Sequence, residues 1–172
     1  MIVLGIDPGM AILGYGVVEQ CGSSLKPIDY GVVTTPPDMM TAQRLTVIFE
    51  AVGQLIDRYC PESIAVEELF FNKNAKTALP IGHARGVAIL AAALKSVEVY
   101  EYTPLQVKQA VVGYGRASKQ QVQQMVRMLL GLKEIPKPDD AADALAVSIC
   151  HLHSIALQKK LQHETGSAIF RY

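Results

Sequence analysis

Alternating hydrophobic and polar positions predict three strands within the first 35 residues of the chain. The strand-like segments are 2–7, 13–20 and 26–34, and turn-forming residues separate them. Pro8-Gly9 ends the first segment, and Gly22-Ser23-Ser24 forms a hairpin turn between the other two. Three consecutive strands of this kind predict an antiparallel meander.

The next segments alternate between helical and strand-like patterns. Residues 41–59 carry apolar side chains at helical spacing, which predicts a helix that covers the sheet. The short segment 63–69 returns as a strand, and the helical crossover before it predicts parallel pairing with the first strand. A helix over 75–96 and a strand over 97–102 complete an α/β fold with a five-stranded mixed sheet flanked by helices.

Two more helices follow a glycine-containing loop at 113–116. One begins at Ser118, where Ser-x-x-Gln is typical of a capping box, and the last runs from about 138–140 to about Gln158. A chain of 172 residues suits one domain. We therefore expect a single domain over 1–158 and a flexible C-terminal tail over 159–172.

Several classes of protein are excluded by simple features of the sequence. No apolar run reaches the roughly 18 to 20 residues of a membrane span, and the N-terminus lacks a signal-peptide pattern, so we expect a soluble, cytoplasmic protein. Cys21, Cys60 and Cys150 form no paired motif, which favours buried free thiols over disulfides or zinc. His151 and His153 lie two apart on a predicted helix and cannot share one metal ion.

Charge is distributed unevenly along a chain whose net charge is zero. Residues 1–71 carry 3 basic and 9 acidic side chains, whereas residues 72–133 carry 9 basic and 2 acidic ones. The middle segment is therefore a candidate surface for a polyanion such as nucleic acid. The alternative is that these lysines and arginines only solvate helices.

Acidic residues end two of the predicted strands. Asp7 closes the first strand directly before Pro8-Gly9, and Glu67 and Glu68 close the strand that should pair with it. Side chains alternate across a strand, so only one of the two glutamates can share a face with Asp7. The pattern does not say which one.

A third acidic group opens the last helix. Acids in a first helical turn suit the helix dipole, which accounts for Asp139 and Asp140 without any further role. Asp143 is different, because the residues that follow it are mostly apolar and no basic residue in that segment is free to pair with it. Strand-end and helix carboxylates together are oxygen ligands for hard cations such as Mg²⁺ or Mn²⁺.

The order and spacing of seven motifs resemble the RuvC family of Holliday junction resolvases. The motifs are GIDPG at 5–9, AVEELF at 65–70, NKNA at 72–75, ARGVA at 84–88, QVKQAVVG at 106–113, KQQVQQMVRMLL at 119–130 and DAADALA at 140–146. The resemblance covers roughly residues 1–155. It implies an RNase H-like fold and a magnesium-dependent endonuclease that cuts DNA crossover junctions.

The resemblance also implies roles for particular residues. Four carboxylates would bind two Mg²⁺ ions, and the matching positions are Asp7, Glu67, Asp140 and Asp143, so it selects Glu67 over Glu68 and Asp140 over Asp139. Family residues that contact DNA match Lys108, Lys119 and an aromatic at Phe70 or Phe71. Implied partners are four-way junction DNA, a second copy of the chain, and the RuvA and RuvB branch-migration proteins.

Other functions would use some of the same residues. An RNase H-like nuclease for structured RNA would share the chemistry and differ in its substrate loops. A sugar-kinase or chaperone-type ATPase shares GIDPG but needs a second phosphate-binding half, for which 172 residues leave no room. A non-catalytic DNA-binding scaffold explains the basic segment but not Glu67 and Asp143.

Residues 86–94 predict a contact between two copies of the chain. This stretch of the second helix, GVAILAAAL, is apolar on every face, and a small domain can cover only part of it. Pairing about a twofold axis would bury the rest against its own copy. Ala91 and Leu94 are the positions that we expect at that contact.

Overall fold

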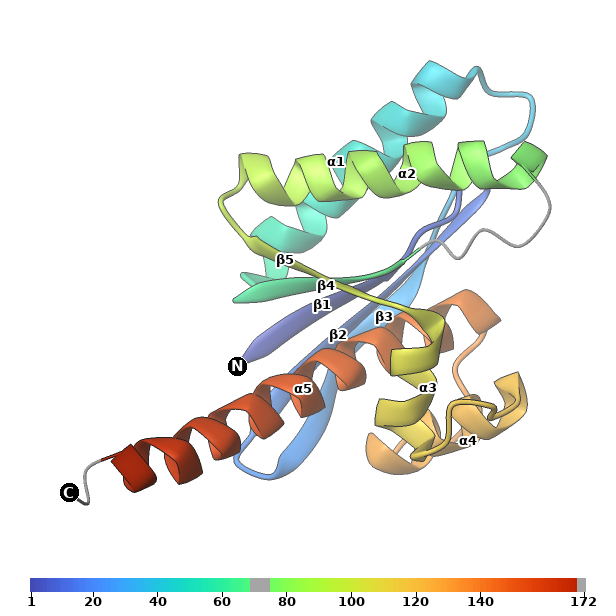
Figure 1. Ribbon diagram of the computed structural model, residues 1–172. Coiled ribbons are helices and arrows are strands. Elements are labelled where there is room, and N and C mark those ends of the chain that lie inside the picture. Colours follow the sequence, from blue (N-terminus) through green and yellow to red (C-terminus); the bar gives the residue numbers. More distant parts are fainter. Residues whose placement is uncertain (69–74, 170–172) are drawn as a thin grey trace.

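A computed structural model shows a five-stranded mixed sheet with helices on both faces (Figure 1). It describes residues 1–68 and 75–169, with the side chains of 75–77 and 158–169 left aside. The strands are β1 (Ile2–Asp7), β2 (Ile12–Cys21), β3 (Ser24–Thr34), β4 (Ser63–Glu67) and β5 (Glu98–Tyr102). Their order is β3-β2-β1-β4-β5.

The pairing of the strands confirms the predicted topology. β1 and β2 are antiparallel, as are β2 and β3, and they form the meander. β4 pairs in parallel with β1 on its other side, and β5 pairs in parallel with β4. The central strand is thus β1, and the acid at its end lies in the middle of the sheet.

The helices form two layers (Figure 1). α1 (Thr41–Tyr59) and α2 (Ala75–Leu94) cover one face of the sheet. α3 (Pro104–Val112), α4 (Lys119–Leu129) and α5 (Asp139–Ile169) lie on the other. Each layer has its own hydrophobic core, because successive side chains of the central strands alternate between the two faces.

The burial of alternate residues in β1 and β4 shows which helices each face of these strands contacts. Leu4, Ile6 and Val66 are fully buried against α1 and α2. Val3 and Ala65 are fully buried in the core beneath α5. Odd-numbered residues of both strands therefore face α5, and this alternation sets the direction of the acids at the strand ends.

Some helix boundaries differ from the sequence predictions. α3 is not among the predicted helices, although Thr103 and Gln106 form a capping box and Pro104 occupies the first turn. α5 continues to Ile169 as a helix, beyond the predicted end near Gln158 and through most of the expected tail. The sequence 158–169 contains no proline and one glycine, so nothing in the backbone chemistry stops the helix.

The structure also shows which cysteines are buried and what His151 contacts. Cys150 is buried as expected, but Cys21 and Cys60 are exposed, because they lie at the end of β2 and after α1. His151 is fully buried and bridges the Ser63 hydroxyl and the Tyr102 hydroxyl, each at 2.8 Å. Burial lowers the pKa of His151 to about 4, so the ring is a neutral structural link between α5 and the sheet.

One expectation about residues 86–94 of α2 is wrong, namely that Ala91 is available for a contact between two copies of the chain. Ala91 is 1% exposed and belongs to the core, so it is not a surface position. Leu79, Leu90 and Leu94 point outward instead and are at least half exposed. In the described part of the chain no helix is long and apolar enough to cross a membrane.

Glycines in β1 and β2 allow α5 to lie unusually close to the sheet. A Cβ atom on Gly5 would lie 2.2 Å from the Ala144 carbonyl oxygen, and one on Gly14 would lie 2.0 Å from the Asp140 carbonyl oxygen. Neither neighbour is a flexible side chain that could move aside. The close approach places the first turn of α5 directly over the end of β1, since Gly14 pairs with Asp7.

We predict that Gly14→Ala destabilises the protein by about 3 kcal/mol, because the new methyl group must displace the backbone of α5. Urea unfolding followed by circular dichroism would measure this loss. Gly86→Ala is the matched control, since nothing lies within 4 Å of its added Cβ. It should stabilise the α2 interior by about 0.5–1 kcal/mol, and equal effects of the two substitutions would contradict the packing argument.

Candidate active site

Two strand-end acids lie side by side at the centre of the sheet. Ile6 pairs with Val66 in the parallel ladder, so Asp7 and Glu67 are the next residues in register. Both acids are at odd-numbered positions, so their side chains project to the face covered by α5. Glu68 continues the ladder through a 2.8 Å bond from its amide to the Tyr102 carbonyl, and alternation turns its side chain to the other face.

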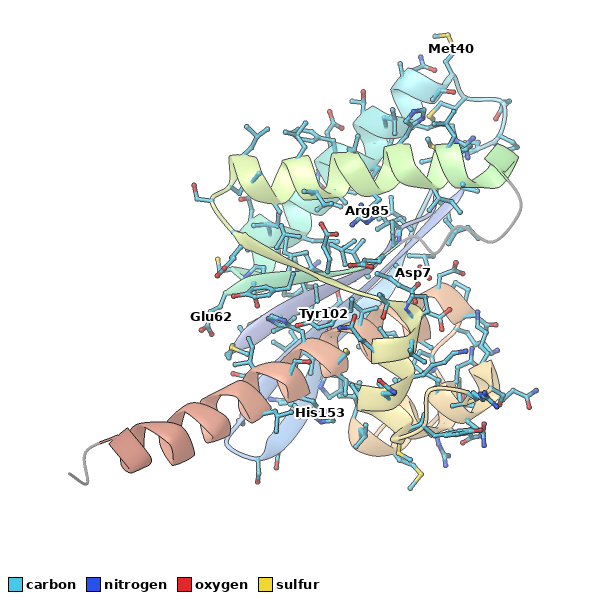
Figure 2. All side chains as sticks on the ribbon, viewed as in Figure 1. Asp7, Met40, Glu62, Arg85, Tyr102 and His153 are labelled. Atoms are coloured by element: carbon cyan, nitrogen blue, oxygen red, sulfur yellow. The ribbon has the colours of Figure 1, made fainter. Side chains whose placement is uncertain are left out.

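The first turns of α5 bring two more acids to the same place. Gly14 is the partner of Asp7 in β2, and the backbone of Asp140 packs directly on it. Asp143 follows three residues later on the same side of the helix. Figure 2 shows Asp7 at the end of β1, between the α2 layer and the α3–α4 pair. The four acids named by the sequence resemblance are therefore brought together.

Asp139 lies next to the cluster and is more exposed. Lys137 donates to its carboxylate at 3.0 Å, and that bond holds the pKa of Asp139 below its usual value. The Asp139 side chain is 43% exposed. Its neighbour Asp140, in contrast, is one of the charges that act on Asp7.

The electrostatics of the cluster are those of crowded, poorly solvated carboxylates. Burial raises the pKa of Asp7 to about 8, and the negative charges of Glu67, Asp143 and Asp140 add to the effect. Burial, with the charge of Asp143, raises the pKa of Glu67 to about 7. The pKa of Asp143 is raised as well, first by burial. Such a group of acids gains from any cation placed among them.

Lys119 supplies one such positive charge. Its ammonium group lies 2.9 Å from the Asp143 carboxylate and 3.6 Å from that of Asp139. Asp143 therefore has a basic partner, which comes from α4 and not from its own segment of the chain. The lysine lowers the pKa of Asp7, Glu67 and Asp143, but burial outweighs it at all three.

A groove next to the acids is bordered by lysines. It has a volume of about 220 Å³ and joins the strand end to α3, α4 and α5. Glu67 and Asp143 form its acidic wall, and Lys108 and Lys119 lie on the same surface. Both lysines lower the pKa of Glu67, which shows that their charges act on the site. This groove will be called the lysine groove.

The donor set fits hard divalent cations. Carboxylate oxygens without sulfur or imidazole are the ligands that Mg²⁺ and Mn²⁺ prefer. In the described residues no three His, Cys, Asp or Glu side chains already converge as a finished metal site. Rotation of the carboxylates about their side-chain bonds would thus accompany binding of a metal ion. Phe70 and Phe71 lie outside the described residues.

Comparison with known proteins places this chain in a family. The family model described as "Crossover junction endodeoxyribonuclease RuvC" matches residues 3–151. The chain belongs to the RuvC family. A relative of that name from Alkaliphilus oremlandii is 60% identical over 154 residues, covering 90% of this chain and 94% of the relative. One from Clostridioides difficile is 56% identical over 169 residues, covering 98% and 100%.

Solved structures agree with this membership of the RuvC family. RuvC from Thermus thermophilus is 42% identical with a TM-score of 0.85, over 92% of this chain and 97% of that one. The same protein in complex with a Holliday junction substrate gives a TM-score of 0.88, over 92% and 96%. The yeast mitochondrial Holliday junction resolvase, at 15% identity and a TM-score of 0.70 over 96% and 85%, shares the fold.

We predict that Asp7→Asn stabilises the metal-free chain at pH 8.5 by on the order of 2 kcal/mol. The folded pKa of Asp7 is about 8 and its ordinary value is 3.8, so wild-type stability falls as pH rises through that interval. Asparagine does not titrate, and its advantage should therefore grow from pH 5 to pH 8.5.

Urea unfolding in EDTA at several pH values would measure the difference in stability. Asp38→Asn, at an exposed loop residue between β3 and α1, is the control substitution. A constant difference between Asp7→Asn and wild type across this pH range would contradict the raised pKa.

Proposed function

We propose that this chain is a metal-dependent endonuclease that resolves four-way DNA junctions. The observation that carries the proposal is the cluster of Asp7, Glu67, Asp140 and Asp143 in a chain of the RuvC family. Related proteins are named for cutting crossover junctions, and one solved relative holds a Holliday junction. Resolution would consist of paired nicks in two strands of the junction, for homologous recombination and DNA repair.

The four carboxylates would hold two Mg²⁺ ions in each subunit, and Mn²⁺ would substitute. Two such ions about 3.5–4 Å apart activate water and stabilise the leaving oxygen of a phosphodiester. The residues support this role, because crowding and burial leave Asp7 and Glu67 in need of positive charge. Hydrolysis would leave a 5′-phosphate and a 3′-hydroxyl.

The lysine groove would bind the sugar-phosphate backbone of the cleaved strand. Lys108 and Lys119 lie beside Glu67 and Asp143, so a phosphate held by the lysines would be adjacent to the bound cations. Lys119 would then serve both the DNA and Asp143. An aromatic contact with junction bases by Phe70 or Phe71 is carried by the family resemblance alone.

A dimer would supply the two active sites that paired nicking requires. Leu79, Leu90 and Leu94 form an exposed apolar face on α2, and Leu94 also lines a groove of about 370 Å³ between α1 and α2. Isologous pairing of this face about a twofold axis would bury it. We also propose, from the family alone, that the chain works with RuvA and RuvB and that it is cytoplasmic.

We predict that Asp7→Asn, Glu67→Gln, Asp140→Asn and Asp143→Asn each lower junction cleavage by on the order of a thousandfold or more. Each substitution removes metal-binding charge but little DNA contact, so junction affinity measured in Ca²⁺ should remain. Single-turnover cleavage of a synthetic mobile junction with Mg²⁺ is the measurement, with structured RNA as a second substrate.

Glu68→Gln and Asp139→Asn are the matched controls, because each neutralises an acid next to the cluster. Both should retain most of the cleavage rate. An inactive Glu68→Gln beside an active Glu67→Gln would overturn the assignment. Faster cutting of RNA than of junctions by the wild-type chain would overturn the proposed substrate.

We predict that Leu94→Glu converts the dimer to a monomer at micromolar concentration, since it places charge on the apolar face of α2. Light scattering would measure the mass, and loss of concerted nicking of both strands should accompany the change. Ile28→Glu, at a comparably apolar but distant site on β3, should stay dimeric. A wild-type monomer that still nicks both strands in concert would contradict the proposal.

A further inference from the structure

A second groove also reaches the carboxylate cluster, and its lining differs in chemical character from that of the lysine groove. It has a volume of about 410 Å³ and is lined by residues 9–12 after β1, by Pro80 and Ile81 of α2, and by Asp140. Apart from Asp140, the side chains that line it are apolar. The two grooves share no lining residue, but each includes acids of the same cluster.

The wall formed by residues 9–12 is held in a fixed shape. Thr35 is 4% exposed, and its amide donates to the Ala11 carbonyl at 3.0 Å while its hydroxyl donates to the Met10 carbonyl. Arg44 in turn donates from Nε to the Thr35 hydroxyl at 2.8 Å. The loop therefore presents its surface without having to be ordered by a ligand.

The tight path of this loop leaves Ile12 at the surface. A Cβ atom on Gly9 would lie 2.1 Å from the Ile12 carbonyl oxygen, so the turn closes on itself at that point. The Ile12 side chain is 37% exposed at the edge of the groove, whereas Met10 is 7% exposed beneath it. The groove thus offers a firm apolar surface next to Asp140.

We infer that this apolar groove binds the sugar and base of a nucleotide next to the cleaved phosphodiester. The inference rests on the proposed function, because it takes the carboxylate cluster as the place where the phosphate is cut. A DNA strand that crosses the cluster continues past it on both sides. The lysine groove suits the phosphate backbone on one side, and the apolar groove suits the nucleoside on the other.

The chemistry of the lining favours a nucleoside over a phosphate. None of the described residues that line the groove is basic, so its lining offers no positive side chain to pair with a phosphate. The deoxyribose ring and the faces of a base are largely apolar, so Ile12, Pro80 and Ile81 can cover them without losing hydrogen bonds of their own. A volume of about 410 Å³ is also within the usual range of small-ligand sites.

The test combines a substitution in the protein with the removal of one base from the DNA. Synthetic junctions would carry an abasic tetrahydrofuran nucleotide on the 5′ or the 3′ side of the cleaved bond. Single-turnover cleavage in Mg²⁺ would be compared for wild type, Ile12→Ala and Ile28→Ala. Ile28 is the matched control, because it is an isoleucine of similar exposure, 39%, on the edge strand β3.

We expect base removal on one flank to slow the wild-type enzyme by about fivefold to tenfold, as loss of one apolar contact should. Ile12→Ala should slow cleavage of the intact junction by a similar factor and respond little to the abasic nucleotide. Ile28→Ala should behave as wild type. Such coupling between residue and base is what a shared contact produces.

Equal sensitivity of wild type and Ile12→Ala to base removal on both flanks would overturn the inference, as would no sensitivity in either. Thermal unfolding of both isoleucine variants would verify that neither has lost its fold. Failure of the proposed function has a different signature, because the wild-type chain would then not cut the intact junction at all.

Discussion

The structure depends on one close contact, in which the first turn of α5 lies against Gly14 of β2. Because Gly14 is paired with Asp7, this contact forces the acids of the helix toward the acids of the strands. Electrostatics oppose this clustering of acids, since carboxylates that repel one another are held where water solvates them poorly. The raised pKa of Asp7, about 8, has the same cause, namely burial and the neighbouring negative charges. A cation bound among these acids would offset part of this electrostatic cost.

The mixed sheet makes the contact possible. Antiparallel pairing brings Gly14 beside Asp7, and parallel pairing of β4 brings Glu67 to the same end of β1 from the other side. In a purely antiparallel sheet β4 would begin, and not end, beside Asp7, so Glu67 would lie at the far end of β1. His151 then ties α5 to β4 and β5 through two buried hydrogen bonds, which fixes the position of the helix over the strands.

Much of this arrangement could be predicted from the sequence, and the limits have physical reasons. The meander, the helix over 41–59 and the parallel return strand follow from local periodicity, and the structure confirms them. Periodicity could not choose between Glu67 and Glu68, because the choice depends on which face α5 covers. It also could not find the Lys119–Asp143 pair, since the partners belong to different helices. The pattern of the helix alone placed Ala91 at the surface, whereas tertiary packing buries it.

A net charge of zero is compatible with a DNA-cleaving site of this kind. Screening at physiological ionic strength limits electrostatic attraction to about 8 Å, so a phosphate responds to nearby groups and not to the whole chain. Lys108 and Lys119 lie on the same groove as Glu67 and Asp143, whereas other acids, such as Asp57 and Glu62, lie on exposed surfaces elsewhere. Cations bound by the carboxylates would reverse the sign of the local field. The attraction for DNA would therefore be created where the strand is cut, and it would depend on the bound metal as much as on the lysines.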